Sequence, residues 1–434
     1  MLENCEEMGT VTTEKKLKVS RMAENLIGSE IIKLAGEINE KIKNGEKIYN
    51  LTIGDFNPNY FPIPDGLKSA IVEAYSKNET NYPPADGMPA LRQTVASYLK
   101  QHGDLDYSAA EILIAGGARP LIYSLFCALI DGGDTVLFPV PSWNNNHYTH
   151  LASAKQIMIE TRPENNFMPT AEELKPFLSK ANLIALCSPL NPTGTTFTKE
   201  GLEEICDLVL AENHRRGADE KPLYLMYDQI YWTLTFGETK HYNPVSLRPE
   251  MRDYTVFIDG LSKSFAATGI RVGWGFGPQQ IIDKMKSILG HIGAWAPRAE
   301  QVASAAFMNK SEEVSVYLKH IRNEIHARLE AIHSGIEQLK AEGFQVKSIA
   351  PQAALYLTVQ FDLKGKKKQN GEELKSTQDI TRYLLEEAKI GIVPFSAFGS
   401  SVDSTWYRIS VGTCTLNDTT GIIANLRMAL SKLK

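Results

Sequence analysis

The stretch "FIDGLSKSFAATGIRVGWGFG", residues 257–277, begins as an apolar run and continues into a loop rich in small residues. Short apolar runs that end at turn residues are typical of buried β-strands. Lys263 lies between two serines just after the run, and Arg271 follows eight residues later. Lysine is rarely buried without a partner. The position of Lys263 at the end of a buried strand therefore makes it a candidate functional residue.

The sequence around this stretch alternates helical patterns with short apolar runs from about residue 65 onward. Strands that alternate with helices predict an α/β fold with a mostly parallel sheet, covered by helices on both faces. The runs that we interpret as strands are "EILIAGG" (111–117), "DTVLFPVP" (134–141), "LIALCSPLNP" (183–192), "PLYLMYDQI" (222–230) and "YTVFIDGLS" (254–262).

The pattern changes after Arg298, where long charged helices precede strands near "AALYLTVQF" (353–361) and "WYRISVG" (406–412). This tail predicts a second, smaller α+β domain. A chain of 434 residues is also long for a single core. We predict an N-terminal arm with part of the small domain at residues 1–64, a large domain at 65–305 and the remaining small domain at 306–434.

The composition is that of a globular protein, with 43% hydrophobic and 22% charged residues. No apolar run approaches the roughly 20 residues that span a bilayer, and the first twenty residues lack the apolar core of a secretory signal. The five cysteines form no CxxC pair, which favours reduced thiols. A net charge of −5 argues against nucleic acid as a general partner. We expect a cytoplasmic enzyme without membrane or nucleic-acid partners.

Polar residues follow three of the expected strands. Asn191, Asp228 and Lys263 come at the ends of successive apolar runs, 37 and 35 residues apart. These spacings are close to the length of one strand–helix–strand unit. In an open parallel sheet, ligands bind beyond the carboxyl ends of the strands. If the three strands are neighbours, an amide, a carboxylate and an amine converge on one site. Taken singly, each is an ordinary turn residue.

These residues share a possible chemistry. Lys263, partly buried near the cation Arg271, can lose its proton, and a neutral amine can form a Schiff base. A buried carboxylate such as Asp228 can hold a pyridine nitrogen in its protonated form, which makes the ring an electron sink. Tyr231 is placed to reach a phenolic oxygen on the same ring, and Arg271 would face a phosphate.

Two other features fit the same ligand. The segment "AGGARP" (115–120) stands at a strand-to-helix junction, where backbone N–H groups and the helix dipole bind anions. Trp143, in "VPSWNNNH", is able to stack on a flat ring, although a single tryptophan also serves as core or interface filling.

Three motifs are set aside. "GWGFG" (273–277) resembles a dinucleotide fingerprint but follows a loop, and no helix with a downstream acid fits. His147 and His150 have no evident third ligand, so we expect no metal site. The lysine-rich insertion at 362–376 is interpreted as a solvated loop.

Five segments together resemble the motifs of class I/II aminotransferases, which are fold-type I pyridoxal-phosphate enzymes. They occur in family order, and the resemblance extends over roughly residues 20–430. The segment around Lys263 is most similar to the bacterial aspartate aminotransferase branch. The five segments are "NYPPADGMPALR" (81–92), "SPLNPTG" (188–194), "YDQIYW" (227–232), "LSKSFAATGIRVGW" (261–274) and "WYRIS" (406–410).

The resemblance implies pyridoxal 5'-phosphate as the cofactor, with Lys263 as its covalent anchor and as the general base. Arg408 would bind the substrate α-carboxylate through two parallel hydrogen bonds from its guanidinium group. Tyr82 would reach the phosphate of the neighbouring subunit, which implies a homodimer with shared active sites. The other implied contacts are Asp228 at the ring nitrogen, Tyr231 and Asn191 at the ring oxygen, Arg271, Ser262 and the amides of Ala118 and Arg119 at the phosphate side, Trp143 on the ring face and Gly54 beside the substrate.

Two positions depart from the family pattern. Aspartate-specific relatives carry a lysine for the distal substrate carboxylate where this chain has Ala118, and the side chain of Arg119 is expected to point elsewhere. His291 and Arg298, in the predicted dimer-facing stretch "HIGAWAPRAE" (291–300), are candidates for the distal cation. At Gly260 many relatives carry a serine that helps to bind the phosphate, so one phosphate contact is expected to be absent.

The sequence therefore predicts an aminotransferase that moves an amino group from an α-amino acid to a 2-oxo acid with ping-pong kinetics. Aspartate with 2-oxoglutarate and aromatic amino acids both stay open as substrates. A β-eliminating lyase of the C–S lyase type is the alternative enzyme. A cofactor-sensing DNA-binding regulator is disfavoured, because only 20 to 28 residues precede the first matching segment and the charge is negative.

Overall fold

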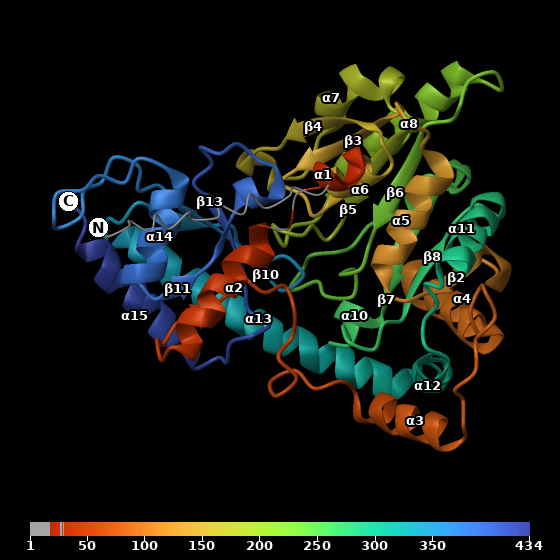
Figure 1. The fold of residues 1–434 in the computed structure, drawn as a ribbon, viewed down its shortest axis with the longest axis horizontal. Helices are drawn as coiled ribbons and strands as arrows, with labels where there is room; N and C mark the ends of the chain where they lie inside the picture. Colours follow the sequence, from red (N-terminus) through yellow and green to blue (C-terminus); the bar gives the residue numbers. More distant parts are fainter. Residues whose placement is uncertain (1–17, 27, 29) are drawn as a thin grey trace, which may run out of the picture.

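The computed structural model describes residues 18–434 except 27 and 29. A seven-stranded sheet forms its centre, in the order β2-β8-β7-β6-β5-β3-β4 (Figure 1). β8 runs antiparallel to both of its neighbours, while β7, β6, β5, β3 and β4 are parallel. The mostly parallel sheet predicted from the sequence is confirmed. Its strands are β2 (Ile112–Ala115), β3 (Thr135–Val140), β4 (Lys155–Glu160), β5 (Leu183–Cys187), β6 (Tyr224–Asp228), β7 (Thr255–Gly260) and β8 (Gly273–Phe276).

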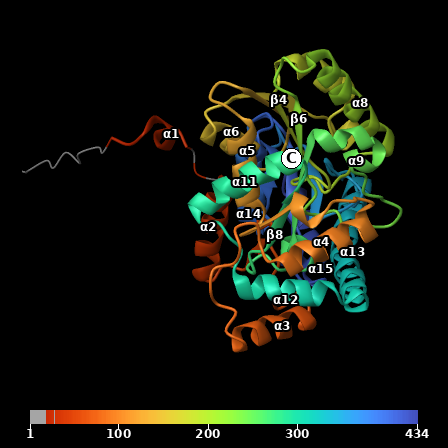
Figure 2. The ribbon, with the colours of Figure 1, turned by 90° about the vertical axis from the view of Figure 1, so that its right-hand side faces the viewer.

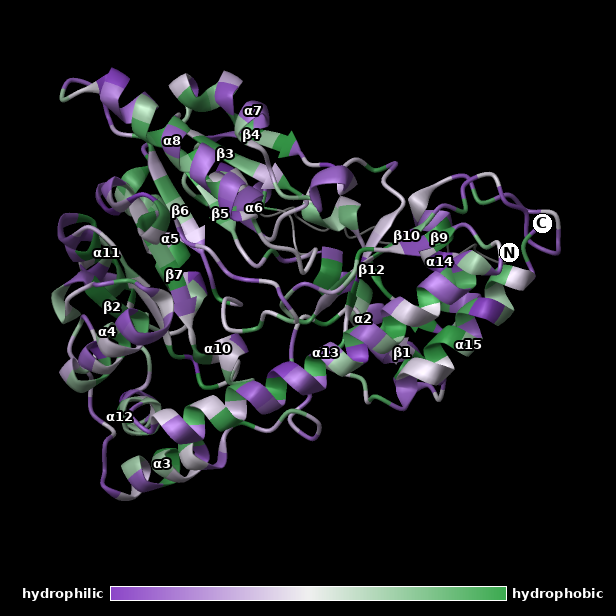
Figure 3. Cartoon of the chain, turned by 180° about the vertical axis from the view of Figure 1, so that it is seen from behind, coloured by the Kyte–Doolittle hydropathy of each residue, from purple (hydrophilic) through white to green (hydrophobic). Residues whose placement is uncertain are grey.

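Helices cover both faces of this sheet, so its strands are buried on both sides. On one face Leu225, Tyr227 and Phe257 pack with the helices α4, α8 and α12, and on the other Met226 and Ile258 pack with α5 and α11. Figure 3 shows β7 largely in the colour of hydrophobic residues. The helices are α4 (Pro89–Gly103), α5 (Ala118–Leu129), α6 (Asn145–Leu151), α7 (Ala171–Leu174), α8 (Lys199–Arg216), α9 (Pro244–Leu247), α10 (Leu261–Ser264), α11 (Gln279–Ile292) and α12 (Arg298–Met308).

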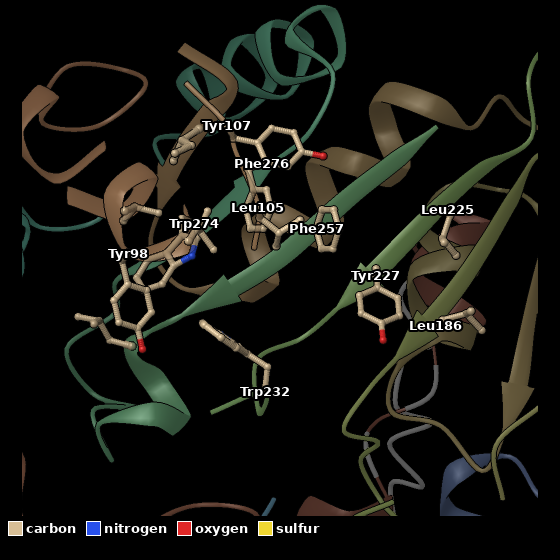
Figure 4. Close-up of a cluster of buried hydrophobic side chains, with 14 of the residues drawn as sticks. Tyr98, Leu105, Tyr107, Leu186, Leu225, Tyr227, Trp232, Phe257, Trp274 and Phe276 are labelled. Atoms are coloured by element: carbon tan, nitrogen blue, oxygen red, sulfur yellow. The ribbon is translucent and has the colours of Figure 1, made fainter. Parts of the chain in front are cut away.

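Aromatic side chains fill the first of these faces beneath the end of β7. Phe257 and Phe276 stack with ring centroids 4.6 Å apart, and Tyr107 meets Phe276 edge-on (Figure 4). Trp232 donates its indole N–H to the buried carboxylate of Asp259 at 2.8 Å. The residues that follow β6 and β7, such as Trp232 and Leu261, therefore pack into this aromatic layer.

A second layer is built from the C-terminal part of the chain. A four-stranded antiparallel sheet, in the order β12-β13-β10-β9, packs against the long helix α13 (Ser311–Ala341). The N-terminal strand β1 pairs in parallel with β11, so the start of the described chain joins this layer (Figure 1). The other elements are α14 (Thr377–Glu387), α15 (Asp418–Ser431), β1 (Tyr49–Asn50), β9 (Val346–Ser348), β10 (Tyr356–Phe361), β11 (Ile390–Gly391), β12 (Val393–Pro394) and β13 (Trp406–Ser410).

Three N-terminal helices complete the molecule. α3 (Asp65–Ser76) lies beside α12 at the edge of the structure in both views, and α2 (Glu30–Lys43) lies with the C-terminal layer (Figures 1 and 2). The short helix α1 (Arg21–Glu24) precedes them. The sequence "SEIIKLAGEINEKIKN" (29–44) predicts Ser29 as a helix N-cap, and Ser29 lies outside the described residues. The domain bounds 1–64, 65–305 and 306–434 stay a prediction. Within the described ranges, no helix is long and apolar enough to cross a membrane.

Candidate active site

The carboxyl ends of β5, β6 and β7 lie side by side, as the spacing of the three polar residues predicted. Cys187 pairs with Asp228, and Asp228 pairs with Ile258. A cavity of about 670 Å³ opens at these strand ends. Eleven of the twelve side chains and backbone segments that the sequence pointed to line this cavity, and Tyr82 does not. The eleven are Gly54, Ala118, Arg119, Trp143, Asn191, Asp228, Tyr231, Ser262, Lys263, Arg271 and Arg408.

Lys263 lies in the one-turn helix α10, directly after β7, and its Nζ donates a hydrogen bond to the carbonyl oxygen of Gly54 at 2.6 Å. Burial and, to a smaller extent, the charges of Arg408, Arg119 and Arg271 together lower the pKa of Lys263 to about 8, against the opposing charge of Asp55. The cation expected from the sequence, Arg271, therefore contributes less than burial does. At this pKa roughly a fifth of the amine is neutral near pH 7.4, far more than for an ordinary lysine.

Asp228 ends β6 with its carboxylate inside the cavity, where Oδ1 accepts a hydrogen bond from the N–H of Ile230 at 3.0 Å. Burial raises the pKa of Asp228 to about 6, and that N–H opposes the shift. A carboxyl group in such surroundings gains from a cationic partner, because an opposite charge stabilises its ionised form.

Arg408 is the buried cation of the opposite wall, carried by β13 with 2% of its surface exposed. Its guanidinium donates to Asn191 Oδ1 at 3.0 Å and to the carbonyl oxygen of Thr52. Its Nε is buried and, in the described part of the chain, has no hydrogen-bond partner. Buried donors are normally satisfied, so an unpaired one at a cavity wall indicates a place for a ligand acceptor.

A phosphate-sized anion fits the junction between β2 and α5. Gly117, with φ +94°, leads into α5, whose first residues Ala118 and Arg119 offer free backbone N–H groups at a helix N-terminus. Arg271 reaches this junction and donates to Gly116 O at 2.9 Å and to Thr268 O at 2.7 Å. A Cβ at Gly117 would lie 2.2 Å from the Arg271 guanidinium, so only glycine allows this approach.

The side chain of Arg119 corrects the sequence analysis, which expected it to point elsewhere. It lines the cavity, and its guanidinium carbon lies 4.6 Å from the ring centroid of Trp143. His291 and Arg298 do not line the cavity of their own chain, and Arg298 forms an ion pair with Glu79 at 2.5 Å. Arg119 therefore lines the cavity together with Arg271 and Arg408.

The presence of glycine rather than serine at position 260 has a structural explanation. Gly260 pairs with Gly273 across β7 and β8, and a Cβ at Gly260 would lie 2.8 Å from the Cα of Gly273. A Cβ at Gly273 would in turn lie 2.6 Å from the backbone of Gly117. The glycines of "GWGFG" therefore let β8 pack closely against the start of α5 rather than bind a dinucleotide. A serine at position 260 would need the backbone to shift.

The other sequence predictions have definite positions. Tyr82 is 80% exposed and meets Trp295 edge-on, with ring centroids 5.3 Å apart. His147 and His150 lie on α6, and no cluster of three or more metal-binding side chains occurs among the described residues. The insertion at 362–376 forms a short hairpin closed by a bridge between Lys367 and Glu373.

Sequence reasoning missed several cavity residues. Tyr356 on β10 places its hydroxyl 2.7 Å from the hydroxyl of Tyr231, and Asp55 accepts a hydrogen bond from Thr268 at 2.7 Å. The only sequence signal for Asp55 was its place next to Gly54. Nothing in the pattern of β10 distinguishes Tyr356 from a core tyrosine. From α2, Ile31, Ile32 and Ala35 also line the cavity.

Comparison with known proteins now identifies the family. A family model described as "Aminotransferase class I and II" matches residues 46–426. The chain belongs to the class I and II aminotransferases. It is 30% identical over 395 residues to an aspartate aminotransferase of Geobacillus stearothermophilus, with 88% of this chain and 92% of that protein covered. It is also 30% identical over 356 residues to a probable aspartate/prephenate aminotransferase of Rickettsia felis, with 81% and 83% covered.

Solved structures agree on the fold. The aspartate aminotransferase from Rhizobium meliloti superposes with a TM-score of 0.87 at 24% identity, over 96% of this chain and 100% of that one. The aromatic aminotransferase from Pyrococcus horikoshii OT3 superposes with a TM-score of 0.78 at 25% identity, over 91% and 98%. The family, the α/β fold and the resemblance to bacterial aspartate aminotransferases are confirmed. The protein is a pyridoxal-phosphate-dependent aminotransferase that works on amino acids and 2-oxo acids.

Proposed function

We propose that this aminotransferase acts on dicarboxylic substrates, with aspartate as amino donor and 2-oxoglutarate as acceptor. The observation that carries the proposal is the pair of cations in the cavity, Arg408 and Arg119. In the described chain Arg119 has no acidic partner and only stacks on Trp143. A carboxylate buried without a partner is costly, so a second cation favours substrates with a second carboxylate. The names of the relatives from Geobacillus and Rickettsia point the same way.

The cavity fits pyridoxal 5'-phosphate in charge and shape. The helix N-terminus at Ala118 and the guanidinium of Arg271 suit the phosphate, and the carboxylate of Asp228 suits a protonated ring nitrogen. Tyr231 and Asn191 supply polar groups for the ring oxygen, and the ring of Trp143, which lines the cavity with Ser262, suits the ring face. When bound, the cofactor supplies the electron sink that stabilises negative charge at the substrate Cα.

Each of the cavity residues then has a separate role in the reaction. Arg408 binds the α-carboxylate with its fork-shaped guanidinium and fixes the substrate beside Gly54. Lys263, neutral once deprotonated, attaches the cofactor and afterwards removes and returns the proton at Cα as general base. Asp228 keeps a proton on the ring nitrogen through its negative charge. Arg119 orients the distal carboxylate of the substrate.

A panel of amino donors and 2-oxo acids tests the reaction. Aspartate and glutamate are expected to change the visible absorption of the purified holoenzyme without an acceptor, and 2-oxoglutarate to restore it. Transfer from phenylalanine is the second candidate, favoured by the apolar wall formed by Ile31, Ile32 and Ala35. Release of pyruvate and ammonia from a cysteine conjugate, independent of any 2-oxo acid, would instead show the β-eliminating lyase.

Replacing Arg119 by alanine is expected to lower kcat/KM for aspartate by about tenfold, because Arg119 is exposed and one lost charge-assisted hydrogen bond costs roughly 1.5 kcal/mol there. Steady-state rates with aspartate and phenylalanine in the same variant provide the comparison. The rate with phenylalanine should stay within about threefold, since its side chain has no charge to pair. An equal loss for both donors would contradict the role of Arg119 in recognising the distal carboxylate.

We further propose that the protein is a homodimer with shared active sites. We also propose that it is located in the cytoplasm. Tyr82 supports the dimer, because its 80% exposed ring stands outside the cavity of its own chain beside Trp295. Sedimentation should give twice the mass of 48.2 kDa. Mixing inactive Lys263→Ala and Tyr82→Ala proteins should restore part of the activity through hybrid dimers, in which one site is intact. A monomeric active protein would contradict this arrangement.

A further inference from the structure

Tyr356 contacts both sides of the proposed chemistry although no motif pointed to it. It begins β10, is 2% exposed and lines the cavity. Its hydroxyl oxygen lies 2.7 Å from that of Tyr231, which stands at the end of β6. The guanidinium carbon of Arg408 lies 4.7 Å from the centroid of the Tyr356 ring. One side chain thus touches the residue proposed for the cofactor ring and the residue proposed for the substrate carboxylate.

The position of the Tyr356 ring is fixed from several directions. Tyr356 pairs with Ser410 in the sheet, and its ring meets that of Tyr231 edge-on, with centroids 5.6 Å apart. Its hydroxyl packs against Gly54, where an added Cβ would lie 2.6 Å from that oxygen. The Tyr356 hydroxyl therefore lies between Gly54, which also accepts the hydrogen bond of Lys263, and the hydroxyl of Tyr231.

The direction of the hydrogen bond follows from counting protons. Each phenol has one O–H donor and can also accept. Burial raises the pKa of both tyrosines, so both keep their protons. If Tyr231 donates its proton to the ring oxygen of the cofactor, as the proposed function requires, the remaining hydrogen between the two hydroxyls must come from Tyr356. Hydrogen bonds that follow one another in a chain strengthen one another.

We propose that Tyr356 is a positioning residue that donates its hydroxyl proton to Tyr231 and so strengthens the hydrogen bond from Tyr231 to the cofactor ring oxygen. The inference rests on the proposed function of this cavity. Tyr356 acts through Tyr231, and its effect is to stabilise negative charge on the ring oxygen. The titratable and charged groups that face the pair are Asp55, Cys187, Asp228, Lys263 and Arg408.

The test is a pH titration of the visible absorption of the holoenzyme, for the wild type and Tyr356→Phe. Phenylalanine keeps the ring against Arg408 and removes only the hydroxyl. The pKa of the cofactor band is expected to rise by about 0.5 to 1, because the variant lacks the hydrogen bond to Tyr231 that helps to stabilise negative charge on the ring oxygen. The same variant should lose about three- to tenfold in kcat, with KM for the amino donor within about twofold.

Two further variants make the test specific. Tyr407→Phe is the matched control, because Tyr407 is also a buried tyrosine of this sheet but donates its hydroxyl to Thr377 at 3.2 Å, away from the cavity. Its cofactor band should titrate as in the wild type. In a Tyr231→Phe background, Tyr356→Phe should not change the pKa of the cofactor band any further, because Tyr356 is proposed to act only through the hydroxyl of Tyr231.

Three results would overturn the inference. One is an unchanged band pKa in Tyr356→Phe, and another is a change confined to KM, which would place the hydroxyl on the substrate instead. The third is an equal shift with and without Tyr231. Failure of the proposed function looks different, because the wild-type protein itself would then show no visible cofactor band and no amino transfer.

Discussion

The Lys263→Ala protein is expected to bind pyridoxal 5'-phosphate without a covalent bond and to lose at least about 10⁴-fold in kcat, since covalent attachment and general-base catalysis both disappear. The amine of Lys263 is the lysine nitrogen that the fold places inside the cavity, at the end of β7 and 2.6 Å from Gly54 O. Borohydride, which makes the lysine–cofactor bond permanent, followed by peptide mass mapping should place the adduct on the peptide that contains Lys263.

Lys284 supplies the matched control for this variant. It is an exposed lysine on α11, outside the cavity, so Lys284→Ala should keep both the adduct and the activity. An adduct on any other lysine, or a Lys263→Ala protein that still transfers amino groups at a tenth of the normal rate, would contradict the assignment.

The pH dependence of cofactor attachment follows from the same side chain. Only the neutral amine attacks a carbonyl, and the pKa of Lys263 is lowered to about 8. In stopped-flow mixing of apoprotein with cofactor, the rate should therefore rise about tenfold per pH unit below pH 8 and level off above it. An ordinary lysine would keep rising to about pH 10.4.

The sequence was sufficient to predict the line of polar residues, because it follows from chain geometry alone. Parallel strands joined by helices end at one edge of the sheet, and Asn191, Asp228 and Lys263 meet there because β5, β6 and β7 are neighbours in the sheet. The junction before Ala118 was predictable for the same reason, as a strand that runs directly into a helix exposes its N–H groups. Each of these predictions needed only the order of elements.

Residues that depend on contacts between distant segments were not predictable. The orientation of Arg119 is set by its stacking on Trp143, 24 positions later, and no periodicity encodes that contact. Tyr356 reads as one more core residue of β10 until the fold places it against Tyr231. Gly260 was interpreted as a missing ligand, whereas the space it leaves is used by Gly273 on the neighbouring strand. Local pattern therefore located the candidate site, and tertiary packing decided how its side chains are oriented.

Asp228→Asn is expected to keep the cofactor attached to Lys263 while kcat falls by about 10³-fold, because roughly 4 kcal/mol of charge stabilisation in a buried site is removed. Asparagine has nearly the same shape and its carbonyl oxygen can still accept the N–H of Ile230, so the strand end should stay in place. What it lacks is the negative charge that keeps a proton on the ring nitrogen. Single-turnover rates with aspartate, measured beside the borohydride adduct yield, separate loss of chemistry from loss of cofactor.

The pH behaviour of the wild type sharpens this prediction. Burial raises the pKa of Asp228 to about 6 in the protein alone, so below that pH the carboxyl group is neutral and resembles the amide of the variant. A bound cationic ring stabilises the carboxylate and moves this pKa lower. Cofactor affinity of the wild-type apoprotein should therefore weaken as the pH falls through 6, and that of Asp228→Asn should lack this step. A variant with normal kcat, or with the same acid step as the wild type, would show that Asp228 does not hold the ring nitrogen.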